Sequence, residues 1–238
     1  MKRLGFYGVR FLVVLLLALA VYNNSGRATG EGGGSGGGSG SGAGTTWTLR
    51  IPGFNELSSV TYGNGLFVAV GGSYSSSTIH ISSNGATWTE QTSPTSNYLN
   101  GVTYGNGLFV AVGYGGAILT SRDGVNWTER TSPTDNSLSG VAYGNGTFVA
   151  VGLDAILTSR DGVRWTKRTS PTSEWLKGVA YGNGTFVAVG WNGTILTSPD
   201  GMSWTEQASP TSDDFNGVTY GNGTFVAVGK DGTILTSP

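Results

Sequence analysis

A phrase of about 39 residues is repeated five times along this chain, and the fifth copy is cut short. The copies begin near Leu57 and at Leu99, Leu138, Leu176 and Phe215. The last copy stops at Pro238, where an Asp-Gly-x-x-Trp element would follow, and the end of that element occurs instead at Thr46-Trp47-Thr48. A repeat whose last copy is completed by the N-terminus predicts a closed ring. We expect residues 47–238 to form one domain.

Each copy is typical of four short strands. In the copy that begins at Leu99 they are expected at residues 102–104, 108–112, 117–121 and 127–130. Asn106-Gly107 separates the first two strands and Asp123-Gly124 the last two, and both pairs of residues accept the positive φ angles of tight turns. Strands this short, joined by turns this tight, form an antiparallel meander.

The second strand of each copy is apolar on both faces, as in the run LFVAV from Leu108. Each sheet should therefore be covered on both sides, which predicts an all-β, five-bladed β-propeller of four-stranded blades. A linear solenoid would need polar capping copies, and the repeats include none.

The connections between copies bear on how the ring closes. Fourteen residues separate the fourth-strand Trp from the next first-strand Val in four connections, and 13 separate Trp47 from Val60. We therefore expect Trp47 to close its own ring, with one N-terminal strand added to three C-terminal strands.

The N-terminus has the composition of an export signal. Lys2, Arg3 and Arg10 precede an apolar run over residues 11–22, and Ala18-Leu19-Ala20 supplies the small residues of a cleavage site. We expect a signal peptide over residues 1–20, or an uncleaved anchor reaching residue 22, followed by a Gly/Ser-rich flexible linker over residues 21–46. The mature protein would be secreted or held at the cell surface, and would meet a membrane only through an uncleaved N-terminal segment.

Charge and residue types exclude several functions. Without residues 1–20 the chain carries 10 basic and 14 acidic side chains, which provides no electrostatic footprint for nucleic acid. The chain has no cysteine, so thiolate zinc sites are excluded. His80 is the only histidine and stands where other copies have leucine, so we expect neither a metal site nor a cofactor.

Residues 121–127, 159–165 and 198–204 each have the form Ser-x-Asp-Gly-x-x-Trp. These segments resemble the Asp-box of BNR-type propellers, a family that includes sialidases and many secreted bacterial proteins. They are one residue shorter between Ser and Trp than the usual box, the first copy has Asn84 for Asp, and the fifth lacks the element. The resemblance implies an outer turn in which the aspartates have a structural role: Asp123, Asp161 and Asp200.

The resemblance also invites comparison with sialidase catalysis, which in that family uses an arginine cluster, a tyrosine nucleophile and acidic partners at the propeller axis. Here Arg122 and Arg160 fall in outer turns, and a tyrosine recurs in every copy, as a packing residue would. Asp213 and Asp214 are the only adjacent carboxylates, and loop neighbours do not set the spacing of a glycosidase pair. We predict that the protein is not an enzyme, with a sialidase-like hydrolase as the less favoured alternative.

The copies differ most in the turn between the second and third strands and in the segment that leaves the fourth, and in a propeller these loops share one face. Candidate ligand-binding residues there are Tyr98, Tyr114, Trp175, Trp191, Asp214 and Lys230. Exposed aromatic rings beside acids and amides suit sugars. The aromatics are expected at different positions in different copies, however, and ordinary loop variation is the competing interpretation.

The sequence thus predicts an exported, non-catalytic propeller that serves in recognition or as a scaffold. Two alternatives stay open: a lectin-like propeller that binds glycans, and a subunit of a surface filament or layer. The sequence determines neither the ligand nor the oligomeric state.

Overall fold

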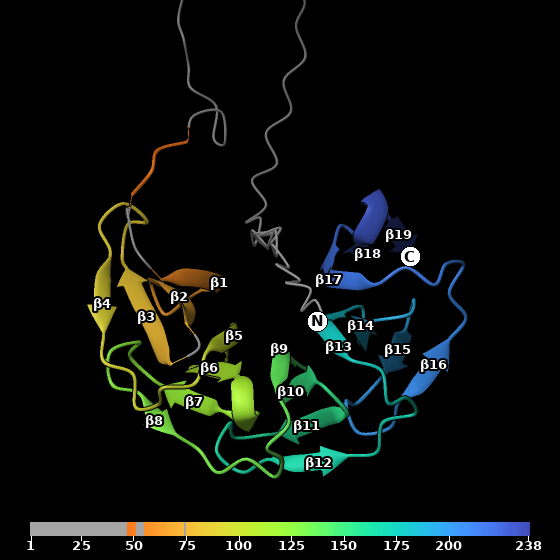
Figure 1. Ribbon diagram of the computed structural model, residues 1–238, viewed down its shortest axis with the longest axis horizontal. Helices are drawn as coiled ribbons and strands as arrows, with labels where there is room; N and C mark the ends of the chain where they lie inside the picture. The colour runs from red at the N-terminus through yellow and green to blue at the C-terminus, as the bar shows by residue number, and fades with distance from the viewer. Residues whose placement is uncertain (1–46, 51–54, 74) are drawn as a thin grey trace, which may run out of the picture.

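The computed structural model describes residues 47–50, 55–73 and 75–238, and these form five antiparallel sheets (Figure 1). The expected signal peptide over residues 1–20 and the expected Gly/Ser-rich linker over residues 21–46 both lie outside the described residues. We call the sheets blades 1 to 5 in chain order.

The blades follow the repeats of the sequence, each as a meander of sequential strands. Blade 1 holds β1 (Glu56–Gly63), β2 (Leu66–Ser73), β3 (Ser76–Ser82) and β4 (Thr89–Gln91). Blade 2 holds β5 (Leu99–Gly105), β6 (Leu108–Gly113), β7 (Ile118–Ser121) and β8 (Thr128–Glu129). Blade 3 holds β9 (Leu138–Gly144), β10 (Thr147–Gly152), β11 (Ala155–Ser159) and β12 (Thr166–Arg168). Blade 4 holds β13 (Leu176–Gly182), β14 (Thr185–Gly190), β15 (Ile195–Ser198) and β16 (Thr205–Gln207). Blade 5 holds β17 (Phe215–Gly221), β18 (Thr224–Gly229) and β19 (Ile234–Ser237), and short 3₁₀ turns follow β6 (Tyr114–Gly116) and β18 (Lys230–Gly232).

The core consists of layers between neighbouring blades. Every residue of β6 is buried, because alternate side chains of the strand face two different sheets. Phe109 packs with Val68 of blade 1, whereas Val110 packs with Phe148 of blade 3. The two apolar faces predicted for the second strand therefore serve two separate interfaces.

The turns between the first and second strands adopt the conformation that their Asn-Gly sequence favours. Asn106 has a φ of 49° and Gly107 a φ of 71°. Positive φ at both central residues is the type I′ pattern, whose twist matches that of the flanking strands. The same pair recurs in all five blades.

The Ser-x-Asp-Gly-x-x-Trp segments form a compact hydrogen-bonded turn after the third strand. In blade 2, Oδ1 of Asp123 accepts the backbone N–H groups of Val125 and Asn126 at 2.9 and 2.8 Å. Oγ of Ser121 accepts the N–H of Gly124 at 2.9 Å. Asp161 and Asp200 make the same backbone contacts in blades 3 and 4. Asn84 does so with its amide oxygen in blade 1.

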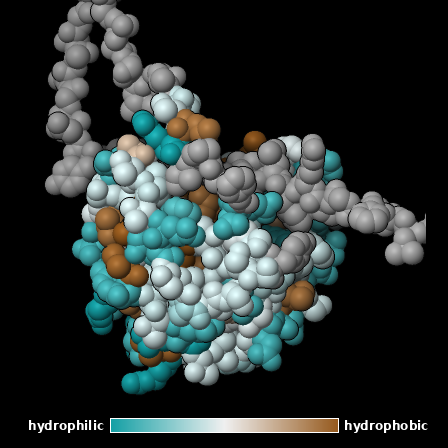
Figure 2. Space-filling view, turned by 60° about the vertical axis from the view of Figure 1, so that its left-hand side comes forward, coloured by the Kyte–Doolittle hydropathy of each residue, from teal (hydrophilic) through white to brown (hydrophobic). Residues whose placement is uncertain are grey.

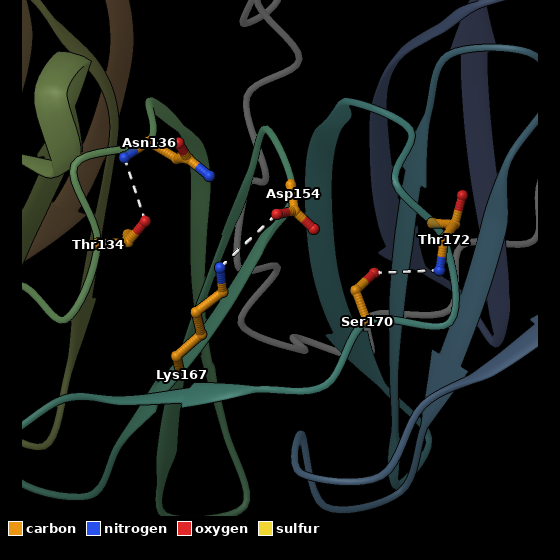
Figure 3. Close-up of polar contacts among 6 residues, drawn as sticks. All are labelled: Thr134, Asn136, Asp154, Lys167, Ser170 and Thr172. Atoms are coloured by element: carbon orange, nitrogen blue, oxygen red, sulfur yellow. Dashed lines mark hydrogen bonds and ion pairs between the residues drawn. The ribbon is translucent and has the colours of Figure 1, made fainter.

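The Ser-Pro-Thr connections between blades are held by their own hydroxyl groups. The N–H of Asn136 donates to Oγ1 of Thr134 at 3.1 Å, and the N–H of Thr172 donates to Oγ of Ser170 at 3.3 Å (Figure 3). These short local bonds satisfy backbone donors that no strand pairs.

A tyrosine and a glycine meet at each blade interface. A Cβ atom on Gly63 would lie 2.1 Å from the ring of Tyr104 in blade 2. The contact is repeated by Gly105 with Tyr143, Gly144 with Tyr181, and Gly182 with Tyr220, at 2.0 to 2.1 Å. Four residues before Gly105 on the same strand, a Cβ atom on Gly101 would lie 3.2 Å from the Cα atom of Gly140 in blade 3. Only glycine leaves room for these rings and backbones.

The five blades form an arc whose ends stay apart. The innermost strands contact one another in succession, β1 with β5, β5 with β9, β9 with β13, and β13 with β17. Within the described ranges no contact of similar extent joins β17 to β1, and Figure 1 shows the two at opposite ends of the arc. The sheet of blade 5 has three strands, β17 to β19, and residues 47–50 are not part of any strand. Closure by the N-terminal strand stays a prediction.

Candidate binding site

The variable loops of each blade meet in a fixed backbone arrangement. The residue that follows the second strand donates its N–H to the carbonyl of the residue that precedes the first strand of the same blade. This pairing joins Tyr114 to Tyr98, Leu153 to Ser137, Trp191 to Trp175, and Lys230 to Asp214, at 2.9 to 3.0 Å. The six residues predicted as ligand contacts are thus three such pairs. The expectation that the aromatics occupy different positions is wrong, because Tyr98 matches Trp175 and Tyr114 matches Trp191.

The pair in blade 4 forms an aromatic cluster with a lysine. The rings of Trp175 and Trp191 lie 5.1 Å apart, and Nε1 of Trp175 donates to Oγ of Ser139 in blade 3 at 2.7 Å. Nζ of Lys177, on β13, lies 3.4 Å from the centroid of the Trp175 ring and 5.1 Å from that of Trp191. Trp191 remains 37% exposed. A cation over an indole is attracted to the negative face of the ring.

An ion pair in blade 5 borders this cluster. Lys230 donates from Nζ to Oδ2 of Asp214, and the backbone N–H of Asn192 donates to Oδ1 of Asp214 at 3.0 Å. The Asp214 carboxylate thus ties blade 5 to the loop that carries Trp191. Asp214 and Lys230 therefore belong to the same site as the two tryptophans.

The surroundings shift the pKa values of these charged groups. Burial lowers the pKa of Lys177 to about 8, against the opposing effect of the Asp214 charge. Burial alone would raise the pKa of Asp214, but the hydrogen bonds from Lys230 and Asn192 lower it below its usual value. The hydrogen bond to Asp214 raises the pKa of Lys230. The site therefore combines a firmly charged ion pair with a lysine that titrates near neutral pH.

The pair in blade 2 belongs to a different contact. The rings of Tyr98 and Tyr114 lie edge to face at 6.0 Å. The Tyr98 hydroxyl is hydrogen-bonded to Oγ of Ser58 and lies 3.4 Å from a carboxylate oxygen of Glu56, both in blade 1. Burial raises the pKa of Tyr98. The structure therefore does not bring Tyr98 and Tyr114 together with the blade 4 cluster.

A shallow polar depression of about 520 Å³ lies next to the Trp191 loop. It is lined by Asn192 and Thr194 on the loop side and by Glu206 and Gln207 of β16. Amide, hydroxyl and carboxylate groups there can donate and accept hydrogen bonds.

The six candidate ligand-binding residues did not include Lys177, although its ammonium group lies near both indole rings. The position of Lys177 in the repeat could have identified it. Lys177 corresponds to Ser58 and Ser139, and each of these bonds to the aromatic residue of the following blade. A long side chain at this position reaches the loop cluster.

The described part of the chain contains no cluster of three or more side chains suited to hold a metal ion. No helix within it is long and apolar enough to cross a membrane.

Radially arranged antiparallel meanders whose facing sides pack against one another define the class of β-propeller proteins. Two solved propeller structures illustrate the likeness. YCF48 bound to D1 peptide matches at 18% identity and a TM-score of 0.63, covering 80% of this chain and 65% of that one. A catalytically inactive virginiamycin B lyase from Staphylococcus aureus, with quinupristin, matches at 15% identity and a TM-score of 0.65, covering 79% and 72%.

A computationally designed protein, Ika8, matches at 13% identity and a TM-score of 0.58, covering 76% of this chain and 57% of that one. At such identities the likeness shows the fold alone. This chain spans about 65% of the length of the YCF48 chain. No protein-family model matches the sequence, and neither does any curated protein.

Proposed function

We propose that this protein is an exported, non-catalytic propeller that recognises a peptide segment of a partner protein through the loops of blades 4 and 5. The observation that carries the proposal is the cluster of Trp175, Lys177 and Trp191, which the Asp214–Lys230 ion pair borders. The proposal of export rests on the sequence of residues 1–20.

The chemistry of the cluster suits a peptide. Trp191 offers a partly exposed indole face, and aromatic residues dominate the energetics of protein interfaces. Lys177 supplies a cation for an acidic side chain or a carboxylate, and the Asp214–Lys230 pair supplies both signs of charge at the border. The YCF48 structure, in which a propeller of the same fold binds a peptide, supports this class of partner.

A glycan is the second candidate, favoured by the polar depression beside Trp191. A sugar ring could stack on the indole while its hydroxyls bond to Asn192, Glu206 and Gln207. The same loops would then act as a lectin site.

A selection experiment separates the two. The full exported chain is immobilised and panned against a random peptide display library, and the same protein is applied to a glycan array. Enriched peptides are synthesised and their affinities measured by calorimetry. The proposal predicts an enriched family of peptides whose affinity falls at least about tenfold with Trp191→Ala, a typical loss for an interface hot spot. A glycan hit without a peptide hit supports the lectin, and no hit of either kind overturns both.

Tyr114→Ala is the matched control. Tyr114 occupies the same loop position in blade 2 and is similarly exposed, at 43%. The proposal predicts that this variant keeps the affinity for the selected peptides. Trp191 is preferred to Trp175 as the test residue, because Trp175 also bonds to Ser139 across a blade interface.

The finer assignments of the sequence stay part of this proposal. The hydrogen-bonded turns around Asp123, Asp161 and Asp200 support kinship with Asp-box propellers. N-terminal sequencing of the exported protein tests the signal peptide, since cleavage after Ala20 leaves Val21 as the first residue.

A further inference from the structure

The outer sides of blade 1 and blade 5, at the two ends of the arc, correspond to the two sides of the interface that joins neighbouring blades. Neither is covered by another blade of the described chain. At the tail face, on blade 5, a Cβ on Gly217 or Gly221 would meet nothing within 4 Å, whereas the equivalent glycines of blades 2 to 4 face a tyrosine or a glycine of the next blade. At the head face, on blade 1, Tyr62 is 59% exposed. Tyr62 is the counterpart of the four tyrosines that fill this contact inside the arc.

The apolar surface is concentrated at the same places. Among the large hydrophobic residues that the structure describes, the four most exposed are Trp47 and Leu49 at 83%, Ile234 at 65% and Tyr62 at 59%. Ile118 and Ile156 hold the position of Ile234 in blades 2 and 3 and are fully buried under the next blade. On the face of the molecule that Figure 2 shows, the hydrophobic residues form small separate areas. Exposed apolar areas such as those at the two ends of the arc mark interaction surfaces.

Residues 47–50 have the sequence of the fourth strand of a blade. In blades 2 and 3 the fourth strand pairs Thr128 with Thr120 and Thr166 with Thr158. Nε of Arg130 and Nε of Arg168 then donate to Oγ1 of those third-strand threonines at 2.8 Å. In the same register Thr48 would face Thr236, and Arg50 would reach the Thr236 hydroxyl.

The connection between Trp47 and Val60 is short, so the blade that receives residues 47–50 must lie beside blade 1. That blade can belong to the same chain or to a second copy. Thirteen residues from Trp47 to Val60 place the fourth strand on a blade directly beside blade 1. Among the residues that the structure describes, no contact as extensive as those between neighbouring inner strands joins β17 of blade 5 to β1 of blade 1. Closing the arc on itself would require blades to rotate at internal interfaces, and there the tyrosine rings and glycines are already in close contact.

We propose that two copies of this chain join head to tail: the head face of one copy seats on the tail face of another, and residues 47–50 of the first add the fourth strand to blade 5 of the second. The occupant of each free face is thus a second copy, because the faces continue an interface that the chain already makes four times. The contact is heterologous, so it can propagate from copy to copy.

Light scattering after gel filtration of the full chain at several concentrations tests the proposal. The expected result is a mass that rises with concentration to multiples of the monomer. Gly221→Val should abolish this rise, because its side chain has free space in one chain but would occupy the site of the incoming Tyr62 ring. A concentration-independent monomer of the unaltered chain overturns the proposal.

Mixing two variants sharpens the test. Tyr62→Ala lacks a working head face but keeps the tail face, and Gly221→Val has the opposite defect. Each alone should be monomeric, and an equimolar mixture should form a dimer that grows no further. Circular dichroism checks that both variants are folded. If the mixture stays monomeric while both are folded, the two faces do not bind each other and the proposal fails.

Disulfide cross-linking shows whether residues 47–50 pair with blade 5 of a second copy or of the same chain. The chain has no cysteine, so introduced cysteines are the only thiols that can react. Thr48→Cys and Thr236→Cys in one chain should oxidise to a ladder of dimers and larger species on a non-reducing gel. The single variants serve as controls and should give no ladder. A disulfide confined to monomers would show that the N-terminal strand closes its own ring, and would overturn the proposal.

Discussion

The ring of Tyr104 occupies the space in which a side chain on Gly63 would have to lie, since a Cβ there would be 2.1 Å from the tyrosine Cγ. One apolar ring thus sits directly on the backbone of the neighbouring blade. The stability of the arc should depend on this contact wherever it occurs.

Gly144→Ala tests that dependence. Its Cβ would lie 2.0 Å from the Tyr181 ring, so the tyrosine or the blade must shift. Overpacking of this kind costs about 2 kcal/mol. Urea unfolding, measured at a dilution that keeps the chain monomeric, should show this loss. Gly221→Ala is the control, with open space at the same position of the repeat, and should stay within about 1 kcal/mol of the unaltered chain. Equal effects of the two substitutions would contradict the role of the contact.

The outer turns should confer acid sensitivity. Hydrogen bonds from backbone N–H groups hold the pKa of Asp161 below 3.8, and those of Asp123 and Asp200 are lowered by the same cause. A lowered folded-state pKa gives stability that is fully present above the ordinary value and is lost as the pH falls through the folded one. Replacing all three by Asn should flatten the decline in melting temperature below about pH 4.

Asn84 shows why asparagine is the informative substitution. Its amide oxygen accepts the N–H groups of Ala86 and Thr87 at 2.8 and 2.9 Å, as the aspartates do in the other blades. Asp161→Asn should therefore cost less than Asp161→Ala, for which the loss of the turn bonds costs about 1 to 2 kcal/mol at neutral pH. Urea unfolding of both variants measures the difference, and an equal loss would contradict the acceptor role.

His80→Leu should stabilise the protein. Nδ1 of His80 is buried and has no hydrogen-bond partner among the described residues. Leu119 and Leu157 occupy the same position in blades 2 and 3 and are fully buried. Removing an unsatisfied buried polar atom should raise the free energy of unfolding by about 1 kcal/mol. Thermal unfolding measures the change, and a lower melting temperature would show that the imidazole has a partner.

Lys177 should make stability rise on the alkaline side. Because burial lowers its pKa to about 8 from 10.5, the unfolded chain binds the proton more tightly in this range. The destabilisation is present below the folded value and is relieved as the pH rises from about 8 to 10.5. As the pH rises across this interval, the melting temperature of the unaltered chain should therefore increase relative to that of Lys177→Met. Tryptophan fluorescence should show a transition near pH 8 that Lys177→Met lacks, and its persistence in that variant would assign it elsewhere.

Much of the fold could be predicted from the sequence because the same turn and strand patterns recur in every copy of the repeat. Asn106-Gly107 predicted a turn, and the structure has positive φ at both residues. The run from Leu108 predicted a strand buried on both faces, and β6 is fully buried. The first strand was expected to begin at Val102, but β5 begins at Leu99. The bulge between Leu99 and Gly101 hides the alternation there.

The openness of the arc could not be predicted in the same way. A count of 13 residues between Trp47 and Val60 limits a distance, but the rotation between blades depends on how closely Gly101 and Gly140 approach. The candidate binding site could be predicted in part from the sequence. Trp175 and Trp191 were found as loop aromatics, whereas Lys177 was not among the six candidate ligand-binding residues, because the sequence does not show that its ammonium group lies over the Trp175 ring.

Because every blade meets the next through the same tyrosine and glycine, this one contact does not depend on which two blades it joins. A repeat inserted or removed in frame would find neighbours that already fit it. The number of blades can therefore change by duplication or loss of one gene segment, without a new contact having to arise. The loops at Trp175 and Trp191 lie outside this contact, so each added blade would bring a loop pair that is free to diverge.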